Sequence, residues 1–351
     1  MKAQRLEKLR SLMEENTAVF ISGKANIFYY SGFTSDDARL LITPDKQYII
    51  TDSRYTIQAR EQAPEFEIID TSVGYKAIFE KAKDFDIAVE EDYITLREID
   101  KIRDVISDEQ NILKKQSEIS APRKIKSEKE IKAIAQAEHI GDEAFTYILD
   151  KIRPGVSEAE IALELEFFMR KCGASALSFE TISASGKRSA MPHGTATGKV
   201  IENGDFLTLD FGCVFEGYCS DMTRTVVVGK ASDWQKEIYD VVLKAQLAAL
   251  DALSAGMKCN EVDTIARDII AEAGYKENFG HGLGHSVGIE IHEMPSLSPR
   301  CEEIIKSGHI LTVEPGIYIE NKGGVRIEDL VAVTDDGMIN LTKSPKELLE
   351  L

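Results

Sequence analysis

The sequence lacks the features that would place the protein outside the cell or in a membrane. Its five cysteines are odd in number and form no CxxC pair, which favours reduced thiols over a disulfide framework. No run approaches the roughly 18 apolar residues of a membrane span. The first residues lead into a mixed charged segment and not into an apolar export signal. We therefore expect a cytoplasmic protein that does not enter a membrane.

Positive charge is also scarce. The chain has 42 lysines and arginines against 60 aspartates and glutamates, which gives a formal net charge of -18. An acidic surface repels phosphates, so nucleic acids and anionic membranes are not expected as primary partners. The content of 43% hydrophobic and 29% charged residues is ordinary for a soluble globular protein. The 351 residues suit two domains at roughly 100–200 residues per domain.

The two domains differ in their patterns. Residues 1–120 alternate short strand and helix signals, and their polar residues have no metal-ligand spacing. We interpret this part as an α/β scaffold. Pro122 interrupts the pattern, and Ser127 with Glu130 then forms a capping box that predicts a long helix toward Asp150. We place the catalytic domain at residues 121–351.

The second domain contains a faint internal repeat. A helix predicted at residues 155–173 has a counterpart of equal length at 256–274, and glycines bound both. Each helix is followed by a predicted hairpin, at residues 206–228 and 310–331. Capped helices are common, but matched hairpins in the same order favour a duplicated plan. The sequence thus predicts an α+β domain with a pseudo-twofold repeat.

Each predicted hairpin carries one acid on each arm. Asp210 lies at the end of an apolar strand, and Asp221 begins the returning strand. Glu314 and Glu328 occupy the corresponding places in the second hairpin. An acid within an apolar strand is costly unless it is paired or bound to metal. Carboxylates that face each other repel unless a cation lies between them. The pattern predicts a metal site.

Histidines gather near these acids in the sequence. Four of the six do so: His193, His281, His285 and His292. Alternating glycines at 280–288 disfavour a helix, so we predict a Gly-rich turn and then a strand from Ser286 to Ile291. A lone histidine is usually a surface or hydrogen-bonding residue. Four beside buried acids favour catalysis or metal binding.

The acids and one histidine form a chemically coherent set. Its members are Asp210, Asp221, His285, Glu314 and Glu328. Four carboxylates and one imidazole suit two divalent ions such as Mn²⁺, with Co²⁺, Zn²⁺ and Fe²⁺ as alternatives. Two such ions bring four positive charges, so the buried site can be close to neutral. Ions roughly 3.5–4 Å apart can activate a water and stabilise a hydrolytic transition state.

The order of these segments and their local sequences resemble those of the pita-bread metallopeptidases, the family of methionine aminopeptidase, aminopeptidase P and prolidase. The matching segments are Asp210 with Asp221, His281-Gly-Leu-Gly-His285, Thr312-Val313-Glu314-Pro315-Gly316 and Arg326-Ile327-Glu328-Asp329. The N-terminal half, with residues 25–33 and 51–55, resembles the creatinase-like first domain of the proline-directed branch. Methionine aminopeptidases generally lack that domain. Creatinase relatives share the fold but not the five ligands.

The resemblance implies a role for each member of the set. Asp210 would chelate one ion, while His285 and Glu314 would bind the other. Asp221 and Glu328 would bridge the two ions. Glu314 would also transfer protons, since it would border the attacking water.

Further residues receive roles from the same resemblance. His193 and His292 would contact the substrate and the tetrahedral intermediate. Four residues would bind substrate or support the site from behind: His281, Arg326, Tyr318 and Thr223. Arg326 and Thr223 would hold the carboxylates in place.

The resemblance also implies hydrolysis of the peptide bond before proline. The short two-domain length favours an Xaa-Pro dipeptidase (prolidase), with aminopeptidase P, which acts on longer peptides, as the alternative. A dipeptidase must hold a free carboxylate, for which Arg300 or an arginine of the N-terminal domain is a candidate. A metal-free binding protein on this fold is disfavoured because all five ligands are present. Family analogy implies a homodimer to which the N-terminal domain contributes.

Overall fold

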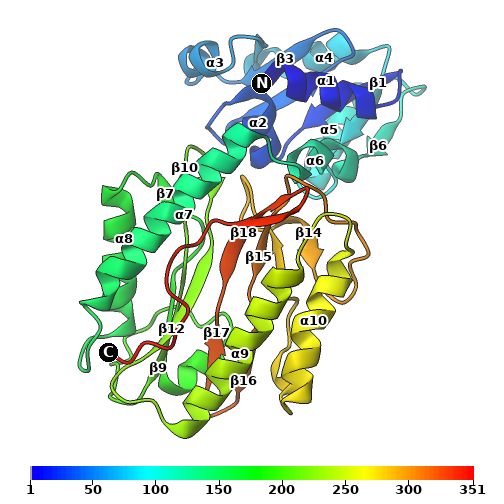
Figure 1. Ribbon diagram of the computed structural model, residues 1–351. Coiled ribbons are helices and arrows are strands. Elements are labelled where there is room, and N and C mark those ends of the chain that lie inside the picture. Colours follow the sequence, from blue (N-terminus) through cyan, green and yellow to red (C-terminus); the bar gives the residue numbers. More distant parts are fainter. Residues whose placement is uncertain (1) are drawn as a thin grey trace. The chain divides into compact units, whose positions relative to one another are not determined.

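The computed structural model describes residues 2–351, and they form two units, one up to Arg123 and one comprising Lys124–Leu351 (Figure 1). The first unit is built on a mixed six-stranded sheet in the order β4-β3-β2-β1-β5-β6. Its strands are β1 (Thr17–Ile21), β2 (Ala38–Ile42), β3 (Gln47–Thr51), β4 (Glu67–Asp70), β5 (Asp86–Val89) and β6 (Ile112–Lys114). Its α-helices are α1 (Lys2–Leu12), α2 (Lys24–Ser31), α3 (Thr56–Gln62), α4 (Gly74–Phe79), α5 (Leu96–Arg103) and α6 (Gln116–Lys124).

The second unit has four long helices and antiparallel sheets. The helices are α7 (Glu128–Leu149), α8 (Glu158–Lys171), α9 (Asp233–Ala252) and α10 (Cys259–Glu272). One sheet has the order β12-β9-β8, formed by Met222–Val227, Phe206–Phe211 and Ile182–Ser185. Another has the order β14-β13-β15-β18-β19, formed by Glu293–Leu297, Gly284–Ser286, Ile310–Val313, Asp329–Thr334 and Gly337–Asn340. No helix within residues 2–351 has both the length and the apolar character to cross a membrane.

The predicted repeat is visible in both halves of this unit. α8 and α10 each have 14 residues. The β9–β12 pair encloses a small hairpin of β10 (Cys213–Phe215) and β11 (Tyr218–Cys219), and the β15–β18 pair encloses one of β16 (Gly316–Ile319) and β17 (Gly323–Arg326). Gly212 lies between β9 and β10, where the inner hairpin leaves the outer strand pair. A Cβ on Gly212 would lie 2.0 Å from the Ser220 carbonyl oxygen, so only glycine fits there.

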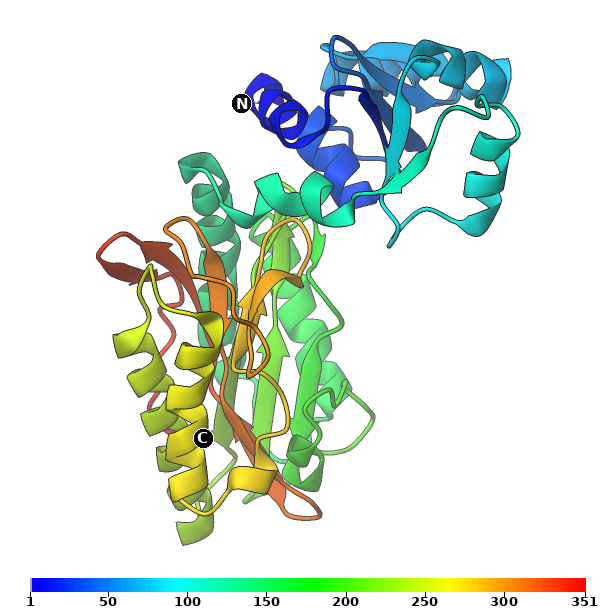
Figure 2. The same cartoon turned by 90° about the vertical axis from the view of Figure 1, so that its right-hand side faces the viewer.

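Each half packs its own helix pair on its own strands. Ile140 of α7 and Leu165 of α8 share a buried cluster with Leu209 of β9. Val242 of α9 and Val262 of α10 share another with Leu311 of β15. Figures 1 and 2 show the helix pairs flanking the strands of the second unit, with α9 and α10 side by side. Asp210 of β9, His285 of β13 and Arg326 of β17 line one cavity of this unit.

Arg224 joins the two halves from inside the core. It is the largest of the fully buried side chains in the described chain. Its guanidinium donates to five acceptors: the carbonyls of Thr223, Glu328, Ser344 and Pro345, and the Asp329 carboxylate. The residues after β19 therefore return to the first half, where Leu349 and Leu351 also bond the backbone of Val227.

The predicted strand from Ser286 to Ile291 is wrong. β13 ends at Ser286, and residues 287–292 form a turn before β14. The Gly288 amide donates to the Glu290 carbonyl, and the amides of Ile289 and Glu290 donate to the Glu293 carboxylate. Amide groups that are bound in this way cannot join a strand ladder, so the segment after Ser286 is a turn and not a strand.

Candidate active site

The antiparallel pairing brings the four predicted acids together. Thr223 pairs with Asp210 across β9 and β12, and Asp221 immediately precedes β12. Val313 pairs with Asp329 across β15 and β18, so Glu314 and Glu328 are adjacent in the second half. The acids thus lie where each inner hairpin leaves its outer strands. His285 comes from the neighbouring strand β13.

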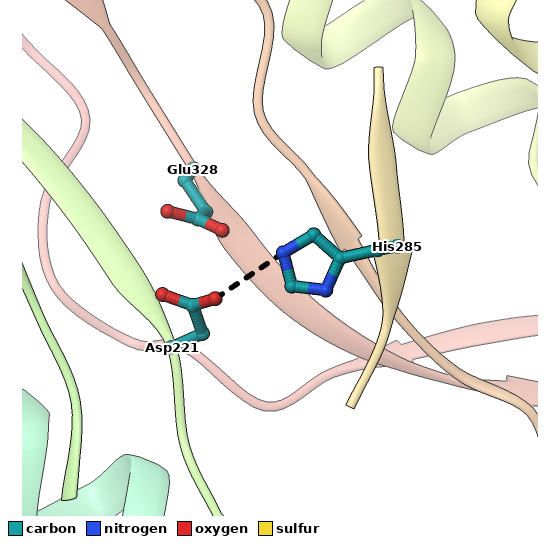
Figure 3. Close-up of side chains that lie close together, drawn as sticks. All are labelled: Asp221, His285 and Glu328. Carbon is teal, nitrogen blue, oxygen red and sulfur yellow. Dashed lines mark ion pairs between the residues drawn. The ribbon is translucent and has the colours of Figure 1, made fainter. Parts of the chain in front are cut away.

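Three of the predicted ligands already face one another. One ligand atom each of Asp221, His285 and Glu328 lies within 4.8 Å of the others. His285 Nε2 lies 3.5 Å from Asp221 Oδ2 and 3.4 Å from Glu314 Oε1. Figure 3 shows the Asp221 and Glu328 carboxylates and the His285 ring converging from three segments of the chain. Asp210 and Glu314 are not members of this compact group, and Asp210 Oδ2 lies 2.5 Å from Arg326 Nη2.

The crowding of these acids is electrostatically unfavourable without a cation. Burial, and then the nearby Glu328 and Asp210 carboxylates, raise the pKa of Asp221 well above its ordinary value. Burial, followed by Glu314 and Asp210, does the same to the pKa of Glu328. Burial is also the main reason why the pKa of Glu314 rises to about 7. A divalent ion between the carboxylates would reverse these shifts.

Unsatisfied oxygens give an independent test of the fit to metal. Asp210 Oδ1 and Glu328 Oε1 are buried and have no hydrogen-bond partner among the described residues. Buried oxygens without a partner are uncommon and require an explanation, such as an ion. With the carboxylate-rich donor set, they make residues 210, 221, 285, 314 and 328 a fitting site for divalent cations.

Arg326 and Thr223 form a chain of hydrogen bonds between two of the candidate ligands. Besides its bond to Asp210, Arg326 donates from Nε to Thr223 Oγ1 over 3.0 Å. The Thr223 hydroxyl in turn donates to Glu328 Oε2 over 2.6 Å. This chain fixes two of the candidate ligands relative to each other.

Tyr318 and His281 extend the same network. Arg326 Nη1 donates to the Tyr318 hydroxyl, which lies 2.9 Å from His281 Nε2. His281 Nδ1 lies 2.8 Å from the Gly282 carbonyl, which can only accept, so Nδ1 carries the proton and Nε2 accepts from Tyr318. Burial lowers the pKa of His281 to about 4, so the ring is neutral. Its bonds indicate a supporting role.

A cavity of about 480 Å³ opens over the acids. Exposed side chains of His193 and His292 line it, together with all five ligand candidates. The His292 ring lies 4.4 Å from the His285 ring in a T-shaped contact. Partial burial of the ring, and then the neighbouring His285 and His193, lower the pKa of His292, so this ring is neutral at neutral pH. Both histidines are placed to meet a ligand in the cavity.

Several contributors were missed from the sequence. The Thr312 hydroxyl accepts from the His285 amide and donates to Glu314 Oε1, and its position two residues before Glu314, on the same strand face, was an available signal. Buried Glu138 of α7 accepts from the Asp221 amide. Ser296 and Ser298, whose hydroxyls are 3.1 Å apart, line the cavity. Arg326 is the only arginine or lysine among the described lining residues, which do not include Arg300.

Comparison with known proteins identifies the family. Residues 132–335 match the metallopeptidase family M24, and this segment is more than half of the chain and contains all five ligand candidates. The chain belongs to metallopeptidase family M24. Residues 5–125 match the creatinase/prolidase N-terminal domain. The expected fold, a creatinase-like α/β domain followed by a pita-bread metallopeptidase domain, is confirmed.

Relatives of this M24 metallopeptidase are similar over nearly their whole length. An Xaa-Pro dipeptidase of Pyrococcus horikoshii is 39% identical, with 99% of each chain covered. The structure of an Xaa-Pro dipeptidase from Bacillus anthracis has a TM-score of 0.96 and 43% identity, with 100% of each chain covered. That of an X-Pro aminopeptidase from Thermotoga maritima has a TM-score of 0.91 and 39% identity, with 99% of this chain and 100% of the other covered.

Proposed function

We propose that this M24 metallopeptidase hydrolyses the Xaa-Pro bond, with dipeptides as its main substrates. The observation that carries the proposal is the cavity whose floor holds four carboxylates and His285 and whose wall presents His193 and His292. The full-length similarity to proteins named Xaa-Pro dipeptidase supports the substrate class. Aminopeptidase P activity is the alternative, because the X-Pro aminopeptidase of Thermotoga maritima is similar over the same length.

Two divalent ions would be held by Asp210, Asp221, His285, Glu314 and Glu328, and when bound they would supply Lewis acidity and lower the pKa of a water. Oxygen-rich ligands favour Mn²⁺ as the native metal. We propose that Arg326, Thr223 and Thr312 keep the carboxylates oriented for this purpose, as their hydrogen bonds allow. Metal analysis of the purified protein tests the assignment. A protein without metal that binds proline peptides uncleaved would be a binding protein instead.

The protein's own groups provide the remaining chemistry. Glu314 lines the cavity and can take a proton at a carboxylate oxygen and pass it to the leaving nitrogen of proline. His193 and His292 can donate hydrogen bonds to the substrate carbonyl as negative charge develops on its oxygen. The Tyr318–His281 pair keeps Arg326 engaged and so protects the position of Asp210.

We also propose a cellular location and an oligomeric state for the protein. We infer a cytoplasmic homodimer to which the N-terminal unit contributes, on the basis of the reduced cysteine pattern and the family resemblance. Light scattering of the full chain, with and without the first unit, tests the assembly. A full-length monomer at micromolar concentration would contradict it.

Substrate length distinguishes the two activities. We expect Xaa-Pro dipeptides to be cleaved faster than matched Xaa-Pro-Yaa tripeptides, and amidation of the dipeptide to lower kcat/KM at least tenfold, about 1.4 kcal/mol for one charge-assisted contact. Arg326 is engaged with Asp210, so the hydroxyls of Ser296 and Ser298 are the candidate donors to the free carboxylate. The measurement is kcat/KM for each peptide with added Mn²⁺.

The matched peptides also provide the control. Each dipeptide, its amide and its tripeptide share the same first residue, so a difference between them reports only the far end of the pocket. Equal rates for all three would indicate an open pocket and an aminopeptidase P. No cleavage of any Xaa-Pro bond by metal-loaded protein would reject both activities.

A further inference from the structure

A buried ion pair lies next to the site but outside the set of candidate ligands. Lys126 Nζ lies 3.1 Å from Glu293 Oε2, and the two side chains are only 2% and 5% exposed. The residues are far apart in the sequence, since Lys126 precedes α7 and Glu293 begins β14. A buried ion pair is a poor source of stability, because desolvation offsets most of the attraction. A role in placing neighbouring groups is therefore the better explanation.

The contacts of the pair fix the turn that follows β13. Glu293 Oε1 accepts from the amides of Ile289 and Glu290, over 3.0 and 3.2 Å. Lys126 Nζ also donates to Ser286 Oγ over 3.0 Å. A Cβ on Gly288 would lie 2.6 Å from the Glu293 carboxylate, so the turn is wrapped tightly around this group. Lys126 thus connects the beginning of the turn to its end.

The two ends of this turn carry the two histidines that meet in the cavity. Ser286 follows His285, and Glu293 follows His292. The two rings are in T-shaped contact at 4.4 Å, and both line the cavity. Any relaxation of the turn would move the His292 ring relative to His285. Misplacement of a catalytic group by about 1 Å can lower the rate roughly 100-fold.

We propose that Lys126 and Glu293 are positioning residues that hold the His292 ring against His285 in the geometry needed for catalysis. The expected loss of activity rests on the proposed function, whereas the expected displacement of the His292 ring does not depend on the substrate. The pair acts from behind the cavity wall: neither side chain lines the cavity. Because His292 would act on the negative charge that develops during the reaction, its displacement would lower turnover more than peptide binding.

The first test is Lys126→Met, which keeps the length of the side chain and removes its charge. We expect kcat on an Xaa-Pro dipeptide to fall about 10- to 100-fold, with KM within threefold and unchanged metal content. Lys124→Met is the matched control. Lys124 lies two residues before Lys126 and forms a 2.8 Å ion pair with Glu303, but the two side chains of this pair are 30% and 39% exposed. The control should keep kcat within twofold.

A double-mutant cycle tests whether the two residues act together. Glu293→Gln keeps an oxygen for the turn amides but removes the charge that faces Lys126. If Lys126 and Glu293 act through their contact with each other, the double variant should lose no more activity than the single variant with the larger loss. Additive losses, or wild-type kcat in Lys126→Met, would overturn the proposal.

Histidine NMR spectra give a readout that a general loss of stability would not produce. In the full-length metal-free protein, Lys126→Met should shift or broaden the ring signals of His292, assigned with His292→Ala, while those of surface His139 stay unchanged. Gly288→Ala, which pushes on Glu293 without removing a charge, should have the same effect and serves if Lys126→Met fails to fold. Unchanged His292 signals in a folded variant would overturn the inference. If the wild-type enzyme cleaves no Xaa-Pro bond, the function fails while this spectral test remains valid.

Discussion

Glu328→Ala is expected to give a folded protein that binds at least one metal ion fewer and cleaves Xaa-Pro substrates at least about 1,000-fold more slowly, the scale of several kcal/mol of lost transition-state stabilisation. Glu328 is buried beside Asp221 and His285, and its Oε1 atom has no protein partner among the described residues. Metal content and kcat/KM, measured on the same preparation, check the result.

Glu328 is also expected to lower the thermal stability of the metal-free protein. The folded state raises the pKa of Glu328, mainly through burial and then through Glu314 and Asp210, so ionised Glu328 opposes folding above the ordinary glutamate pKa. Glu328→Gln removes that charge and keeps an acceptor for Thr223. It should therefore raise the Tm of the metal-free protein at neutral pH, and the gain should disappear as the pH falls toward the ordinary glutamate pKa.

The control for both experiments is Glu320→Gln, an exposed glutamate just after β16. It should change neither metal content nor Tm. Near-normal turnover of Glu328→Ala with two ions bound would remove Glu328 from the site.

His193→Ala and His292→Ala should each lower kcat about 100- to 1,000-fold and leave metal content unchanged. That is the scale measured for loss of one hydrogen-bond donor to a developing oxyanion. Both side chains are exposed to the cavity, and the His292 ring is neutral and so carries one N–H donor. Steady-state kinetics and metal analysis of the two variants provide the measurement.

A surface histidine provides the comparison for these variants. The His139 side chain on α7 is 59% exposed, and His139→Ala should be indistinguishable from the wild type. If one of the cavity variants loses metal in proportion to its activity, that histidine is a ligand and its assignment to the substrate is wrong.

The sequence predicted local features well because their signals lie within a few neighbouring residues. The apolar run before Asp210 and the capping box at Ser127 both correspond to observed elements, β9 and α7. The matched acids of the two hairpins also predicted a shared site. Individual ligand roles came from the family resemblance, and they remain proposals for this chain.

Contacts between distant segments could not be predicted in the same way. Lys126 and Glu293 are far apart in the sequence, and neither has a local pattern that marks it as buried. The turn at residues 287–292 was mistaken for a strand because its amides bind a side chain that follows in the sequence. Such side-chain bonds to the backbone override strand propensity only once the tertiary structure supplies the acceptor.

The buried guanidinium of Arg224 affects how mutational surveys of this enzyme should be interpreted. A substitution there would leave four carbonyls and the Asp329 carboxylate without that donor at the junction of the two halves. A screen scored by activity in cells would rank Arg224 with the metal ligands, although it does not line the cavity. Soluble yield separates the two kinds of position, because loss of a ligand spares the fold and loss of Arg224 does not. The residues least tolerant of change in this chain will thus include one that never meets a substrate.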